Sequence, residues 1–142
     1  MTIAPSTTTS SPCHLRLYPI DQVLRFAVID GVAHLTIIGK PVELNLVPGT
    51  LMPADQFTDM THDKRHTFRV RSTGETDVPL LEAITHGHYV ATYTDERGVE
   101  RISGSPSHPL TFGYSRQQAS WACTLSGCSL HPDIPYQIAG SI

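Results

Sequence analysis

The sequence predicts a mainly β fold, an antiparallel β-sandwich or barrel with one short helix packed on the sheet. Three observations support this prediction. Short runs alternate between apolar and polar residues, as strands buried on one face do. Eleven prolines and ten glycines interrupt 142 residues, which favours many short strands over long helices. Two pairs of runs are joined by hairpin-like turns, Asp30–Gly31 and Asp95–Gly98.

The stretch from His88 to Leu110 contains the clearest hairpin. The run 88–94 alternates so that Tyr89, Ala91 and Tyr93 share one face, and this face is expected to enter the core. The return run 99–103 carries charges on both faces. We therefore expect this second strand at a sheet edge or a subunit contact.

The remaining elements follow from the same patterns. The Asp-Gly pair at 30–31 favours a tight turn in which both residues have positive φ. Between 50 and 64 neither a helical nor a strand period is present, so a long exposed loop or a loose hairpin tip is expected. The other expected strands span 14–18, 23–29, 32–38, 42–47, 66–72, 110–114, 119–125 and 136–139.

One helix is expected after residue 75. Thr76 or Asp77 can cap it, Pro79 suits its first turn, and Gly87 can end it. Its expected apolar stripe consists of Leu80, Leu81 and Ile84, and these residues should pack on the sheet.

The chain is expected to form one domain over residues 13–142, preceded by a flexible arm over 1–12 that is rich in Ser, Thr and Pro. Inward positions of the strands define the predicted core. They are Leu24, Phe26, Val28, Leu44, Leu46, Phe68, Val70, Phe112, Trp121 and Leu125.

The charge distribution argues against two classes of partner. The formal net charge is −3 and no cluster of Lys or Arg occurs, so binding to nucleic acid or an anionic membrane is not expected. The first residues lack the basic and apolar regions of a secretory signal. We expect a cytoplasmic protein, or one found in a virion or tail-like particle after assembly, with Cys13, Cys123 and Cys128 as reduced thiols.

The eight histidines suggest a metal site as an alternative. On a strand, His86 and His88 would face the same side, and His62 and His66 could approach them. The segment HGHYVATYTDE is similar to the His-x-His motif of the cupin metalloproteins, but Thr92 and Tyr93 stand where that family has a glutamate. We therefore expect structural histidines, and neither a metal nor another cofactor.

The residue types needed for catalysis are present without a recognisable arrangement. Ser105, His108 and Cys123 are available for nucleophilic chemistry, but GSPSHPL is more simply a turn. Asp55, Asp59 and Asp63 lack the glycine and closing glutamate of a calcium loop and are expected to be solvated. The aromatic residues Tyr89, Tyr93, Phe112, Tyr114 and Trp121 have strand spacing that is typical of core positions. Catalysis is therefore not the favoured function.

The second half of the chain resembles small β-rich structural proteins encoded in prophage tail modules. The resemblance lies in an aromatic strand (88–93), a D-x-x-G turn (95–98), a return strand ending in G-S-P (104–106) and the sequence P-L-T-F (109–112). It implies an assembly subunit of a phage-tail-like or virion structure that forms a ring or tube.

An assembly subunit needs contact surfaces, and two segments suit them. We expect homo-oligomers and contacts with other assembly proteins through the 50–64 loop and the central hairpin, since imperfect strands can pair with a neighbouring chain. The expected interface residues are Pro53, Asp55, Phe57, Asp59, Asp95, Glu96, Arg97 and Arg101. The alternative is a small-ligand-binding or metal-dependent β-barrel that uses His86 and His88.

Overall fold

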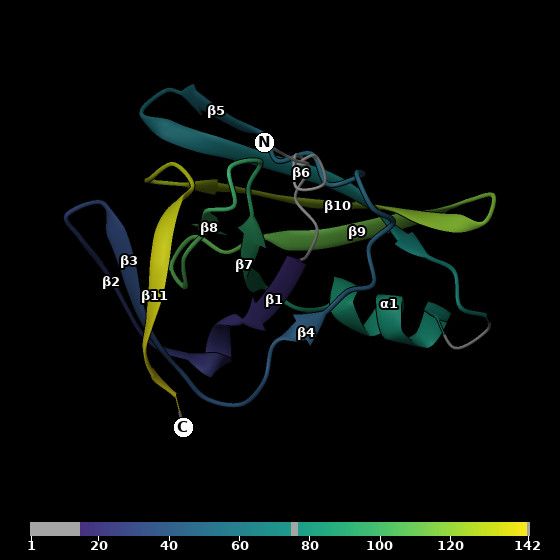
Figure 1. Ribbon diagram of the computed structural model, residues 1–142, viewed down its shortest axis with the longest axis horizontal. Coiled ribbons are helices and arrows are strands. Elements are labelled where there is room, and N and C mark those ends of the chain that lie inside the picture. The colour runs from purple at the N-terminus through teal and green to yellow at the C-terminus, as the bar shows by residue number, and fades with distance from the viewer. Residues whose placement is uncertain (1–14, 75–76, 142) are drawn as a thin grey trace, which may run out of the picture.

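The computed structural model describes residues 15–74 and 77–141, which form two sheets that pack face to face (Figure 1). The larger sheet has the order β2 (Val23–Ile29), β3 (Val32–Ile37), β11 (Ile134–Ser141), β8 (Glu100–Ser103), β7 (Tyr89–Thr94), β1 (Leu15–Pro19) and β4 (Val42–Glu43). The smaller sheet has the order β5 (Asp55–Thr58), β6 (Thr61–Arg71), β10 (Ser120–Ser129) and β9 (Thr111–Gln117). The helix α1 spans Asp77–Thr85, and the 3₁₀ turn η2 spans Ile20–Gln22.

Each sheet keeps two edges, so the prediction of a sandwich is confirmed and the barrel alternative is wrong. Among the strand pairs of the described residues, β11 and β3 run parallel and the others are antiparallel. The predicted arm over 1–12 lies outside the described residues, as do His14 and Thr76.

Two clusters of buried hydrophobic residues pack against the larger sheet, one on each face. The first lies between them and joins Leu15 and Leu17 of β1 to Phe68 of β6 and Leu125 of β10. The second lies on the other face of the larger sheet and includes Val90. The central strand β7 is therefore buried on both faces, and not only on the predicted core face of Tyr89, Ala91 and Tyr93.

The two predicted hairpins are confirmed. Asp30 and Gly31 both have positive φ (53° and 76°), as a type I′ turn requires. At the β7–β8 turn the carboxylate of Asp95 accepts the backbone N–H groups of Arg97 and Val99, which fixes the turn locally. However, β8 lies between β7 and β11 in the sheet, so the prediction that it forms an edge is wrong.

The predicted faces are right except on β2. Seven of the ten predicted core residues are buried, namely Leu44, Leu46, Phe68, Val70, Phe112, Trp121 and Leu125. Leu24 and Val28 are 53% and 39% exposed, and Phe26 is half-buried. The physical reason is that β2 is an edge strand whose register shifts between Val23 and Arg25, which removes Leu24 from the inward series.

One predicted strand, 42–47, is shorter in the structure, and the structure decides between the two alternatives for the segment 50–64. Only Val42 and Glu43 belong to β4, and the chain then crosses to the smaller sheet, where Leu46 pairs with Val70. For the segment 50–64 the structure has the second of the two predicted alternatives, a hairpin, in which β5 and β6 are joined through Asp59 and Met60, both with positive φ. Every residue of β5 is exposed, so the sequence carries no alternation there.

The helix α1 packs through only part of its predicted stripe. Leu81 and Ile84 are buried, whereas Leu80 is 52% exposed. The carboxylate of Asp77 accepts hydrogen bonds from the Thr73 hydroxyl, from Nε1 of Trp121 (3.0 Å) and from the Thr73 backbone N–H, and these bonds, the Thr73 hydroxyl first among them, hold the pKa of Asp77 below its ordinary value. The start of the helix is thereby attached to β10.

Gly127 of β10 is required by close packing. A Cβ there would lie 2.7 Å from the carbonyl oxygen of Pro109 and 2.9 Å from Cδ2 of Leu110, whereas a Cβ at Gly113 of β9 would meet nothing within 4 Å. We expect Gly127→Ala to lower the free energy of unfolding by about 1–3 kcal/mol. Gly113→Ala should leave it unchanged or raise it slightly. Urea denaturation of both variants tests this, and equal effects would contradict it.

Candidate functional site

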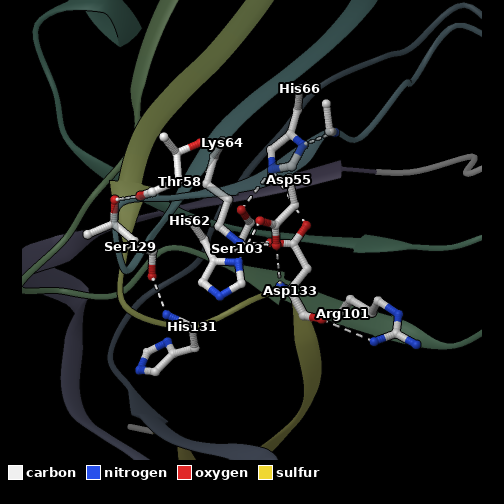
Figure 2. A network of polar contacts seen from close by, with 12 residues as sticks. Asp55, Thr58, His62, Lys64, His66, Arg101, Ser103, Ser129, His131 and Asp133 are labelled. Carbon is white, nitrogen blue, oxygen red and sulfur yellow. Dashed lines mark hydrogen bonds and ion pairs between the residues drawn. The ribbon is translucent and has the colours of Figure 1, made fainter.

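Polar side chains from both sheets meet around the amine of Lys64 (Figure 2). The side chain of Lys64 is fully buried, and its Nζ lies 2.5 Å from Oδ2 of Asp55 and 2.8 Å from Oδ1 of Asp133. We call this group the Lys64 cluster; it comprises Asp55, His62, Lys64, His66, Tyr93 and Asp133.

The fold explains how these groups meet. Asp55 and Lys64 are directly opposite partners on β5 and β6. Asp133 lies in the connection that precedes β11, and its backbone N–H donates to Oδ2 of Asp55 at 3.1 Å. The cluster therefore links the smaller sheet to the larger one.

Asp55 is held in its ionised form. Burial acts to raise its pKa, but hydrogen bonds from Lys64 and from Nδ1 of His62 (2.9 Å) outweigh this and hold the pKa below its ordinary value. The side chain of Asp55 is 20% exposed, so the expectation that it is a solvated charge is wrong.

His66 and Tyr93 complete the cluster as neutral groups. Nδ1 of His66 accepts the backbone N–H of Ala54 (3.0 Å), so Nε2 carries the proton and donates to Oγ of Ser103 (2.7 Å). Burial lowers the pKa of His66, which favours this neutral ring. Burial also raises the pKa of Tyr93 far above its ordinary value, and its hydroxyl donates to Oδ2 of Asp133.

An open cleft of about 580 Å³ adjoins the cluster, because Tyr93 and Arg101 belong to its lining. Nε of Arg101 donates to Asp95 (2.7 Å), and its Nη1 donates to the carbonyl oxygen of Asp133 (3.1 Å). We call this the Tyr93 cleft. Its other lining residues are Gly49, Leu51, Met52, Pro53, Asp95, Glu96 and Arg97.

Five of the eight predicted interface residues line the Tyr93 cleft: Pro53, Asp95, Glu96, Arg97 and Arg101. The other three lie on the β5–β6 hairpin. Asp55 points into the Lys64 cluster, Phe57 is 64% exposed beside the ring of His62, and Asp59 is in the turn.

The structure does not assemble the histidines of the metal alternative into one site. His86 follows α1 and lies 3.6 Å from Glu82, and His88 precedes β7, so neither lies on a strand as that alternative requires. His62 and His66 belong to the Lys64 cluster. Within residues 15–74 and 77–141, no group of three or more His, Cys, Asp or Glu side chains has an arrangement that could hold a metal ion.

The candidate nucleophiles also have structural roles. Ser105 and His108 pair through their backbones in a tight turn, as predicted for GSPSHPL. Cys123 is buried, and burial raises the pKa of its thiol to about 12. Cys128 is a free, exposed thiol, and Cys13 lies outside the described residues. The aromatic residues predicted as core are buried, except that Tyr114 is only partly buried against the core.

Sequence reasoning missed Lys64 and Asp133. A signal for Lys64 was present: it continues the inward series of β6, in which Lys64, His66, Phe68 and Val70 are all buried and the residues between them are not. Asp133 gave no such signal, because it lies in a connection.

Searches against protein-family models, curated proteins and solved structures give no match for this chain. Among the described residues, no helix has the length and apolar character needed to cross a membrane.

Proposed function

We propose that this chain is a non-enzymatic assembly subunit that contacts neighbouring copies of itself at the Tyr93 cleft. The observation that supports the proposal is the convergence of Pro53, Asp95, Glu96, Arg97 and Arg101 on one surface. They come from two segments far apart in the sequence, 49–53 and 93–101, yet they line a single cleft. Its open, mixed-charge lining suits a protein partner.

A second copy is the partner that the charges favour. Glu96 and Arg97 are adjacent and exposed at the β7–β8 turn. Across a two-fold axis, Glu96 of one copy can face Arg97 of the other, and the reverse pair forms by symmetry. The Asp95–Arg101 pair is bonded within the chain and so fixes the turn that presents them. A two-fold contact closes on itself, so the ring or tube implied by the resemblance to prophage tail proteins needs a second, head-to-tail contact elsewhere on the surface.

The experiment is sedimentation velocity over a concentration series. We expect the wild-type chain to self-associate, and Glu96→Arg or Arg97→Glu to weaken the association by about tenfold or more, because each places like charges in contact. The double variant E96R/R97E should recover it, since the swapped charges again pair across the axis. The matched control is Arg71→Glu, at an exposed arginine that does not line the cleft.

A chain that stays monomeric at high concentration, alone and with its natural partners, would contradict the assembly function. Small-ligand binding would then be the remaining candidate, because about 580 Å³ is within the size range of small-molecule sites. That ligand would bind at the Tyr93 cleft. None of His62, His66, His86 and His88 lines this cleft, so the ligand would not depend on the histidines of the metal alternative.

A further inference from the structure

The Lys64 cluster places an amine between two carboxyl groups at a position closed to water. Nζ of Lys64 is within hydrogen-bond distance of both Asp55 and Asp133, and the lysine side chain has no exposed surface. An amine and a carboxyl group held together in this way react far more readily than the same groups in solution.

We propose that Lys64 and Asp133 condense to an intramolecular isopeptide bond, an amide between Nζ of Lys64 and Cγ of Asp133, with Asp55 as the general base. This inference stands independently of the proposed assembly function.

The contacts assign different roles to the two carboxyl groups. Oδ2 of Asp133 accepts the hydroxyl of Tyr93, a bond that draws electron density from the carboxyl carbon and stabilises negative charge on that oxygen during attack. Asp55 has the shorter contact to Nζ, 2.5 Å against 2.8 Å. Hydrogen bonds from His62 and from the Asp133 backbone orient the Asp55 carboxylate towards this position. Asp133 is therefore the acceptor, and Asp55 takes the proton.

The reaction balances without a co-reactant. The ammonium group of Lys64 passes one proton to Asp55, and the free amine attacks Cγ of Asp133 to form the new C–N bond. One C–O bond of the Asp133 carboxyl group then breaks. The departing oxygen takes the proton held by Asp55 and a second proton from Nζ, and it leaves as water. Nothing is oxidised or reduced.

The bond would connect the two sheets covalently. Lys64 lies on β6 of the smaller sheet, and Asp133 immediately precedes β11 of the larger sheet. The closed loop would contain α1 and all strands from β7 to β10, so the crosslink would constrain the unfolded chain as a long-range disulfide does. It would require no oxidising compartment.

The test is the intact mass of the purified full chain under denaturing conditions. We expect the wild-type protein to be lighter than its encoded mass by one water molecule. A tryptic digest should contain a branched peptide that joins the segment ending at Arg65 to the segment beginning at Gln117. Far-UV circular dichroism confirms that each sample is folded before denaturation.

Two variants separate this reaction from other losses of water. Lys64→Arg keeps the positive charge but cannot form this amide, so it should have its full encoded mass; a succinimide at Asp30–Gly31 would persist in this variant. Asp55→Asn keeps the shape of the base and should also remain unreacted. Folded wild-type protein at its full encoded mass, or a water loss that survives Lys64→Arg, would overturn the isopeptide bond. A crosslinked Asp55→Asn variant would overturn the role of Asp55.

Discussion

Replacing Lys64 with methionine is expected to lower the free energy of unfolding by about 3–5 kcal/mol, the usual cost of removing one partner from a buried ion pair. Methionine fills most of the lysine volume, so the loss comes from Asp55 and Asp133, which are left facing each other without the cation. Urea denaturation at neutral pH measures the change.

Lys40→Met is the matched control, because Lys40 is exposed and the same substitution there should change stability by less than about 0.5 kcal/mol. A Lys64→Met variant as stable as the wild type would show that the cluster contributes no net stability. The value of about 3–5 kcal/mol applies to wild-type protein whose intact mass shows no amide between Lys64 and Asp133; where the amide has formed, the variant also loses the crosslink, and the decrease should be larger.

Local patterns were sufficient to predict most of the strands. The range of β2 was predicted to the residue, and the Asp30–Gly31 turn has the conformation its residues favour. Both predictions depend only on neighbours in the chain, namely alternation and turn chemistry. The inward residues Phe68, Val70, Phe112, Trp121 and Leu125 followed from the same alternation, and all are buried.

The errors occur where pairing between distant segments decides the outcome. Nothing in the run 99–103 shows that β11 will cover its outer side, because that pairing joins Ile102 to Ile134. Leu24 has the same apolar character as a core residue, and only the register shift against β3 removes it from the core. Strand order and bulges are properties of the assembled sheet.

The Lys64 cluster was missed for a related reason. Its members are distributed over β5, β6, β7 and the connection before β11, so no motif of fixed spacing joins them. The eight histidines suggested His86 and His88 as metal ligands, but both are exposed in the fold. A lysine in an inward position of an otherwise apolar series was the stronger signal, because a buried amine requires a carboxyl partner from elsewhere in the fold.

A substitution in the helix α1 should have the second large effect on stability, and the adjacent residue provides its control. Leu81→Ala should lower the free energy of unfolding by about 3–5 kcal/mol, because Leu81 is only 1% exposed and its loss leaves a cavity in the cluster between the sheets.

Leu80→Ala should change stability by less than about 0.5 kcal/mol, because Leu80 is 52% exposed and alanine favours the helix at least as well as leucine. Both variants remove the same atoms from the same helical turn, so thermal or urea denaturation of the pair isolates the effect of burial. Similar losses would mean that both leucines pack against the sheets, as the predicted apolar stripe of Leu80, Leu81 and Ile84 requires. A large difference would mean that α1 contacts the core through Leu81 and Ile84 alone, with Leu80 facing solvent.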